Sequence, residues 1–285
     1  MPKKMIIPAD VPPEMHQIFQ KNMNAITLGT GNLFLFACDQ KIEHLNNDFV
    51  GKNIDPEAAN PEHLFAIAQK APIGAMATQV GLIERYGPQY PEVNYIAKLN
   101  SKTNLISSEQ SDPVNALLWD VREVVQLANQ SDLKIRGIGL TIYLGSIHEG
   151  QMLQDAAQQI FEAHLHGLVT ILWMYPRGKA IKDEHDPQLL AGAAGIANAL
   201  GADFVKIKPP SKNLSLVVAA AGNTKVICAG GEQVPAEQLV AEIKMQMHDG
   251  GTAGCAVGRN IFQRSLNDAV ALAQQISEIV YGIKK

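Results

Sequence analysis

The sequence of 285 residues is poor in the features that mark secreted, membrane-spanning and nucleic-acid-binding proteins. Its three cysteines, Cys38, Cys228 and Cys255, are odd in number, lie far apart and each stand inside an apolar run. We therefore expect reduced, buried thiols and no disulfide framework. Charged residues make up only 18% of the chain and the formal net charge is −4. This composition gives no electrostatic reason to expect nucleic acid or an anionic membrane as a partner.

Long apolar runs are missing as well. No segment approaches the roughly 20 apolar residues that a membrane-spanning helix needs. Prolines interrupt the first residues, MPKKMIIPADVPPEM, before any apolar stretch reaches the length of a signal-peptide core. We expect a cytoplasmic protein without a membrane partner.

Metal-binding patterns are absent from the sequence. There is no CxxC pair, and the histidines show no metal-ligand spacing with carboxylates on one element. His164 and His166 lie close together late in a predicted helix, where the helix C-terminus favours positive charge, and we interpret them as structural.

What the sequence does contain is a series of eight short runs of strand-forming residues, each bounded by turn residues. They are NLFLFACDQ (32–40), PIGAMATQ (72–79), VNYIAKLN (93–100), IRGIGLTIYLG (135–145), LVTILWMY (168–175), ADFVKIK (202–208), TKVICAGG (224–231) and TAGCAVG (252–258). Helical patterns separate most of them, as in DPVNALLWDVREVVQLANQ from Asp112, PAEQLVAEIKMQMHDGG from Pro235, and FQRSLNDAVALAQQISEIVYG near the end.

Strands that alternate with helices pair in parallel and close into a barrel or form a doubly wound sheet. Eight strands favour the barrel. The alternative of a dinucleotide-binding fold is weak, because GTGN at 29–32 precedes the first strand and no third glycine completes the motif. The sequence predicts an α/β protein with a (β/α)8 TIM barrel over residues 25–285 after a proline-rich arm over 1–24. The irregular segment 41–61, after the first strand, is either a lid or an inert surface loop.

Strand alternation places lysines inside this barrel. Residues two apart on a strand share a face, so Lys206 and Lys208 lie on one side while Val205 and Ile207 face the helices. By the same reasoning Trp173 and Tyr175 share a face of the fifth strand, and Asp39 ends the first strand.

If these side chains face the lumen near the carboxyl ends of the strands, they converge where barrel enzymes have their active sites. A neutral lysine amine can attack a ketone to form a protonated Schiff base, which serves as an electron sink for C–C bond cleavage or formation. Burial favours the neutral amine, and a second cation at Lys208 is expected to lower the pKa of Lys206 further. Tyr175 would then transfer a proton, and Asp39 would orient substrate hydroxyls.

Each of these residues also has a structural interpretation. A barrel lysine is often held in an ion pair, and Lys98, near the end of the third strand, is either a competing nucleophile or an ion-pair partner. Trp173 and Tyr175 are compatible with ordinary core aromatics.

A phosphate site is indicated by two glycine loops. TIM barrels often bind phosphate with the loops after strands seven and eight and a short helix N-terminus, and these loops read AGGE (229–232) and VGRN (257–260). Gly230, Gly231 and Gly258 allow close backbone approach, and Arg259 adds a cation. Arg177 is a candidate for a second phosphate, or a solvated loop residue.

Seven segments together resemble a known family. CDQKIEH, KLN, LTIYLGS, WMYPRG, GADFVKIK, AGG and VGRN occur in the order expected of archaeal-type class I fructose-1,6-bisphosphate aldolases, a family grouped with deoxyribose-phosphate and tagatose-bisphosphate aldolases. The resemblance spans residues 33–262. It implies that Lys206 forms the Schiff base, Tyr175 transfers protons, Trp173 is a substrate-facing neighbour and Asp39 contacts substrate hydroxyls.

The resemblance further implies a cofactor-free glycolytic and gluconeogenic enzyme that reversibly cleaves fructose 1,6-bisphosphate, assembled as a homo-oligomer such as an octamer or decamer. The sequence departs from the family at Gln40, Lys41 and Ala229. Alternatives are a related lysine-dependent enzyme that acts on another phosphorylated ketose or forms aminodideoxyheptulosonate, a metal-dependent lyase, and a non-catalytic barrel that binds sugar phosphates.

Overall fold

A computed structural model describes residues 6–44, 46–105 and 112–282 of the chain. Its strands form a closed barrel in the order β1-β10-β9-β8-β7-β6-β3-β2, and every pairing between neighbours is parallel. The strands are β1 Leu33–Ala37, β2 Ala75–Gln79, β3 Asn94–Lys98, β6 Lys134–Leu144, β7 Val169–Pro176, β8 Phe204–Ile207, β9 Lys225–Ala229 and β10 Gly254–Val257. The fold is the TIM barrel that the eight apolar runs predicted.

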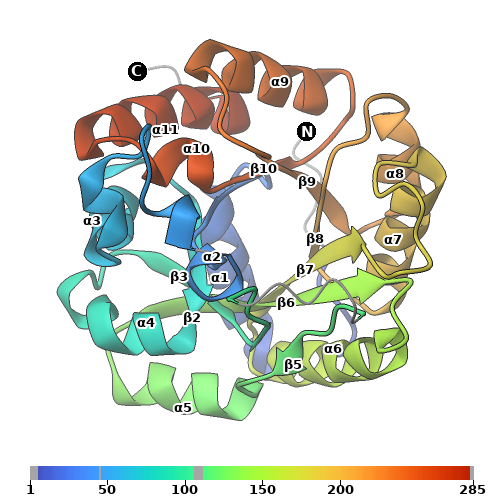
Figure 1. The fold of residues 1–285 in the computed structure, drawn as a ribbon. Helices are drawn as coiled ribbons and strands as arrows, with labels where there is room; N and C mark the ends of the chain where they lie inside the picture. The colour runs from blue at the N-terminus through green and yellow to red at the C-terminus, as the bar shows by residue number, and fades with distance from the viewer. Residues whose placement is uncertain (1–5, 45, 106–111, 283–285) are drawn as a thin grey trace.

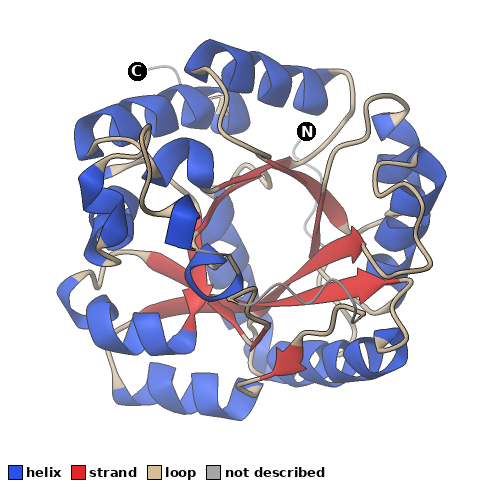
Figure 2. Ribbon diagram, in the orientation of Figure 1, coloured by secondary structure: helices blue, strands red, loops and turns tan. Residues whose placement is uncertain are grey.

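Helices surround the barrel on the outside (Figures 1 and 2). The α-helices are α1 His16–Thr27, α2 Gln40–Glu43, α3 Glu62–Lys70, α4 Val80–Tyr86, α5 Val121–Gln130, α6 Glu149–Leu165, α7 Pro187–Ala199, α8 Leu214–Ala220, α9 Ala236–His248, α10 Arg259–Phe262 and α11 Leu266–Tyr281. Short 3-10 helices are η1 Pro13–Met15, η2 Asn46–Asp48, η3 Pro56–Ala59 and η4 Gly87–Gln89. Two of the predicted helical segments appear as α9 and α11.

The third helical segment begins later than expected. The sequence pattern placed its start at Asp112, but α5 starts at Val121, where Asp120 and Glu123 form a reciprocal capping box. The residues before it include β5 (Ala116–Leu117), which pairs antiparallel with β4 (Asn100–Ser101). A capping box satisfies two backbone groups of the first turn at once, so it fixes the helix start more strongly than the weak periodicity upstream.

Two apolar cores lie on the two faces of the barrel strands. Phe204 and Ile171 belong to the inner core that fills the lumen, whereas Val205 and Ile207 belong to the outer core between strands and helices. The alternation that the sequence predicted for β8 is therefore confirmed. Lys206, between Val205 and Ile207, shares the inward face of Phe204.

The amino-terminal end of the barrel is closed by helix α1. Its residues Phe19 and Ile26 are fully buried in the inner core, and Asn22 donates to the Gly167 carbonyl just before β7. Helix α1 runs across the boundary predicted at residue 24 between arm and barrel. Because α1 fills this end of the lumen, a ligand reaches the inward-facing polar residues from the carboxyl end of the barrel. In the described part of the chain, no helix is both long enough and apolar enough to span a bilayer.

Candidate active site

Lys206 lies on β8 inside the barrel, near its carboxyl end. The residue is 5% exposed, and its Nζ lies 5.3 Å from the ring centroid of Trp173, its register partner on β7. Burial lowers the pKa of Lys206, Asp39 and Glu43 oppose this shift, and Arg177 adds to it. A lysine with a lowered pKa holds more neutral amine at a given pH, which nucleophilic attack on a carbonyl requires.

The cation that adds to this pKa shift differs from the one predicted. Lys208 was expected to repel the ammonium form of Lys206, but its Nζ forms an ion pair with Glu184 in the connection between β7 and α7. Arg177 bonds the same carboxylate through Nε at 2.9 Å. Burial is the largest cause of the lowered pKa of Lys206, and the cation that adds to it is Arg177.

Trp173 lies in the lumen near two lysines. Its ring centroid lies 5.4 Å from Lys98 Nζ and 5.3 Å from Lys206 Nζ. A side chain at Gly139 would place its Cβ 2.2 Å from a ring carbon of Trp173. Only glycine at this position of β6 leaves room for the indole.

Lys98 is held in a buried ion pair, one of the two roles that its sequence position left open. Its Nζ donates to Glu43 Oε1 at 3.2 Å and to the Asn100 carbonyl at 3.0 Å, and lies 3.9 Å from Asp39 Oδ2. The side chain of Lys98 is 0% exposed and that of Glu43 is 12% exposed. Because these oxygens engage its donors in a buried ion pair, the Lys98 side chain is less available to attack a carbonyl than that of Lys206.

Asp39 and Tyr175 complete the lumen cluster. Asp39 lies two residues after the end of β1 and directly before α2, and Gln79 fixes its backbone by donating to its carbonyl at 3.1 Å. Burial raises the pKa of Tyr175, and the nearby carboxylates of Asp39 and Glu43 raise it further. The phenol is therefore protonated near neutral pH and can donate a proton.

Two buried polar atoms beside this cluster have no hydrogen-bond partner among the described residues. They are Thr141 Oγ1 on β6 and Trp173 Nε1 on β7, and the two residues are register partners. Buried polar groups without a partner cost free energy, so a hydroxylated ligand that bonded them would gain affinity.

The glycine loops after β9 and β10 lie beside each other. Arg259 Nη2 donates to the Gly231 carbonyl at 3.3 Å, and Nη1 lies 3.7 Å from Asp48 Oδ1. A Cβ at Gly258 would lie 2.5 Å from the Ala37 carbonyl, so this loop packs directly against the end of β1. The two loops therefore meet at the rim that holds Asp39.

Asn260 joins the same two loops, a role that the sequence did not reveal. Its side chain is fully buried, donates to the carbonyls of Gly230 at 3.0 Å and Glu232 at 2.8 Å, and accepts from the Val234 amide at 2.9 Å. The sequence also gave no role to Glu43 or Glu184. Glu43 stands in CDQKIEH, so its spacing of one helical turn from Asp39 was the available signal.

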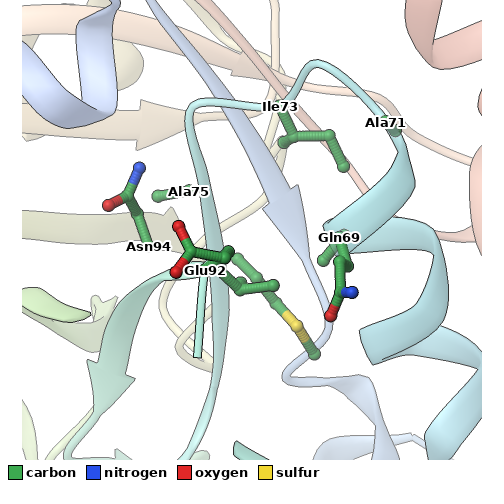
Figure 3. A pocket seen from close by; sticks show the side chains of 9 residues that line it. Gln69, Ala71, Ile73, Ala75, Glu92 and Asn94 are labelled. Atoms are coloured by element: carbon green, nitrogen blue, oxygen red, sulfur yellow. The ribbon is translucent and has the colours of Figure 1, made fainter. Parts of the chain in front are cut away.

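A cavity of about 140 Å³ lies away from this cluster. Figure 3 shows it between the α3–β2 connection and the start of β3, with Gln69, Ile73, Glu92 and Asn94 around it. Because Lys206 lies toward the opposite end of the strands, this cavity has no part in its chemistry. In the described ranges, histidine, cysteine and carboxylate side chains form no group of three or more that could hold a metal ion.

The structure brings Lys206, Trp173, Tyr175 and Asp39 together in the lumen, whereas Lys208 and Arg177 meet through Glu184 at the rim. A TIM barrel with a buried lysine beside a proton donor and a carboxylate is the arrangement of a Schiff-base-forming aldolase, which is a lyase. The family profile described as "DeoC/LacD family aldolase" matches residues 33–264. The chain belongs to this family, whose class I members form a Schiff base on a catalytic lysine.

Three proteins with similar sequences or structures bear on the function of this chain. A Methanocaldococcus jannaschii protein named fructose-bisphosphate aldolase/6-deoxy-5-ketofructose 1-phosphate synthase is 48% identical over 278 residues, which cover 96% of this chain and 89% of the relative. A fructose-bisphosphate aldolase from Slackia heliotrinireducens superimposes with a TM-score of 0.96 at 46% identity, covering 99% of this chain and 91% of the other. These similarities confirm the resemblance, fold and enzyme class predicted from the sequence.

The third is an archaeal fructose-1,6-bisphosphate aldolase whose structure is described with the catalytic lysine covalently bound to the carbinolamine intermediate of the substrate. It has a TM-score of 0.81 and 32% identity, covering 93% of this chain and 100% of the other.

Proposed function

We propose that this enzyme reversibly cleaves fructose 1,6-bisphosphate into dihydroxyacetone phosphate and glyceraldehyde 3-phosphate. The observation that supports the proposal most directly is the buried, inward-facing Lys206, whose pKa burial lowers. The names of the relatives point to the same substrate.

In the proposed reaction, the neutral amine of Lys206 attacks the C2 ketone, and loss of water from the carbinolamine gives a protonated Schiff base. The C3–C4 bond then breaks, the electron pair enters the enamine, and the C4 hydroxyl loses its proton to become the aldehyde of glyceraldehyde 3-phosphate. Protonation at C3 and hydrolysis with water release dihydroxyacetone phosphate and restore the lysine.

Tyr175 is the proposed proton carrier between the C4 hydroxyl and C3. Its raised pKa keeps the resting phenol protonated, so that it can give its proton to the water that leaves the carbinolamine. The phenolate then accepts the proton of the C4 hydroxyl and passes it to C3 of the enamine. Asp39 accepts hydrogen bonds from substrate hydroxyls, and Trp173 forms the apolar wall against which the ketose packs. That wall also excludes water from the iminium ion, which lowers the local dielectric constant.

The two phosphates are assigned to the two cationic parts of the rim. The backbone of Gly230, Gly231 and Gly258 with Arg259 is the proposed site for one phosphate, since the two loops adjoin and Arg259 of the second loop bonds the first. Lys208 and Arg177 are the proposed site for the other, because both lie just past the carboxyl ends of adjacent strands.

A second candidate activity follows from one comparison. The relative from Methanocaldococcus jannaschii is also named as a 6-deoxy-5-ketofructose 1-phosphate synthase. That product is a ketose phosphate with one phosphate, so the same lysine chemistry would serve with only one anion site filled.

An activity panel with purified enzyme tests these assignments. Fructose 1,6-bisphosphate is offered beside fructose 1-phosphate, and aldehyde and triose phosphate products are measured in a coupled assay. We expect the bisphosphate to be cleaved with the higher kcat/KM. If the enzyme cleaves neither substrate but still synthesises the deoxyketose phosphate, the result favours the synthase activity.

We also propose that the enzyme works as a cytoplasmic homo-oligomer. Large apolar side chains stand exposed on the described surface, including Ile147 at 82% and Phe161 at 54%. Contact between copies would cover such side chains. The three cysteines are buried and unpaired, which fits a reducing compartment. Light scattering during size-exclusion chromatography measures the assembly; a monomer at micromolar concentration would contradict this proposal.

A further inference from the structure

One carboxylate occupies both cations proposed for the second phosphate. Glu184 Oε1 pairs with Lys208 Nζ, and Oε2 accepts from Arg177 Nε at 2.9 Å. The neighbouring His185 Nε2 lies 3.8 Å from Oε1 of the same carboxylate. All three partners therefore present positive or potentially positive groups to a single anion.

Two connections converge here at the carboxyl end of the barrel: the one between β7 and α7, which holds Arg177 and Glu184, and the one after β8, which holds Lys208. Arg177 follows β7 and lies with its guanidinium carbon 4.8 Å from the ring centroid of Tyr175, while Lys208 follows β8. Glu184 comes from the connection before α7 and reaches back to both. The Glu184 carboxylate therefore lies next to Arg177, which packs against the ring of Tyr175, the proposed proton carrier, and not on a remote surface.

The side chains of this triad are only partly exposed, at 28% for Lys208, 38% for Arg177 and 33% for Glu184. Partial burial strengthens the attraction relative to a fully solvated pair, yet leaves room for exchange with a dissolved anion. Burial alone would raise the pKa of Glu184, but the hydrogen bonds from Lys208 and Arg177 outweigh it and lower the pKa. The competitor is therefore a charged carboxylate.

We propose that Glu184 is a specificity-determining residue that competes with the substrate's second phosphate for Lys208 and Arg177. This inference rests on the proposed function. A phosphate dianion offers these cations more negative charge and more acceptor oxygens than a carboxylate, so it can replace Glu184. A neutral hydroxyl cannot replace Glu184, which then stays paired with Lys208 and Arg177.

The consequence is an affinity penalty that acts only on substrates with a second phosphate. Replacing Glu184 by glutamine keeps the size of the side chain but removes its negative charge. For E184Q we expect the KM of fructose 1,6-bisphosphate and the inhibition constant of inorganic phosphate each to fall about threefold to tenfold. The KM of fructose 1-phosphate stays within about twofold of the wild-type value, because that substrate does not displace Glu184.

Two variants accompany the measurement. Glu92→Gln removes a carboxylate from the ion pair with Lys134 near the amino end of the barrel, away from Lys206, and is expected to change no kinetic constant. Lys208→Met removes one of the contested cations and is expected to raise the KM of the bisphosphate while leaving that of fructose 1-phosphate unchanged.

The opposite outcome overturns the inference. If Glu184 instead holds the two cations in place for phosphate, E184Q raises the KM of the bisphosphate and weakens inhibition by phosphate. An equal change for both substrates likewise contradicts it. Borohydride trapping of dihydroxyacetone phosphate on Lys206 separates this failure from failure of the proposed function: trapping that persists in E184Q keeps the lysine chemistry intact, whereas its absence in the wild-type enzyme removes the function itself.

Discussion

The buried ion pair between Lys98 and Glu43 allows a quantitative prediction. Lys98 Nζ lies 3.2 Å from Glu43 Oε1, and the two side chains are 0% and 12% exposed. Lys98→Met would leave the Glu43 carboxylate without its buried cation, although Ser101 Oγ still donates to it at 3.2 Å. Asp39, 3.9 Å away, loses the same neighbouring charge.

The expected cost comes from this geometry. At 3.2 Å and an effective dielectric constant of about 20, the Coulomb attraction is about 5 kcal/mol, but desolvation of both groups opposes it. Removal of one partner of a buried pair costs about 3–5 kcal/mol of unfolding free energy. The double variant Lys98→Met with Glu43→Gln leaves no uncompensated charge between these two positions, so we expect a coupling energy of about 2–3 kcal/mol.

Urea unfolding of the wild type, both single variants and the double variant measures this coupling. The pair between Lys134 and Glu92 is the matched control, since its side chains are 33% and 76% exposed. Its coupling energy should stay below about 1 kcal/mol. A coupling at Lys98 and Glu43 no larger than in the control, with each single variant costing under about 1 kcal/mol, would refute the reasoning.

Three further predictions concern the lumen and the base of the barrel. The Asp39 carboxylate raises the pKa of Lys206 against the effect of burial, so Asp39→Asn should lower that pKa. The pH at which imine trapping begins to rise should then shift to a lower value. An unchanged pH would contradict this effect of Asp39 on Lys206. Tyr175→Phe should lower kcat by about 10²–10⁴-fold while imine trapping persists; wild-type turnover would exclude Tyr175 as proton carrier. His164 is buried and bonds Asp10 through Nδ1 at 2.8 Å; burial alone would lower its pKa, but bonds to carboxylates on both ring nitrogens outweigh it and raise the pKa. The contribution of His164 to the free energy of unfolding is therefore complete below about pH 6.5 and is lost as pH rises through its raised pKa. In the wild type the free energy of unfolding in urea should fall between pH 6 and pH 9, and His164→Gln should make this fall smaller. A fall of the same size in the variant would contradict this.

The sequence predicted the barrel because each strand is covered on both faces and so reads as a short apolar run. The same alternation placed Lys206, Trp173 and Tyr175 on inward faces correctly, since parity along a strand is a local property. Helix α1 was harder to find, because prolines at its start resemble an arm and its apolar face meets the lumen only in the folded barrel.

The ion-pair partners of the lysines could not be predicted from the sequence. Lys208 and Glu184 are separated by 24 residues, and Lys98 and Glu43 by 55. Which carboxylate reaches which ammonium depends on how the loops at the rim cross, and no local pattern encodes that. Strand parity named Lys208 as the cation that lowers the pKa of Lys206, whereas in the structure Arg177 has this effect and Lys208 pairs with Glu184.

The covalent role of Lys206 is tested most directly by reduction with borohydride in the presence of dihydroxyacetone phosphate, followed by peptide mass analysis. We expect irreversible inactivation and one reduced adduct, located on Lys206, with none in Lys206→Met and an undiminished adduct in Lys208→Met. An adduct on Lys98 or Lys208 instead, or turnover that EDTA abolishes while no adduct forms, would contradict a mechanism built on this amine.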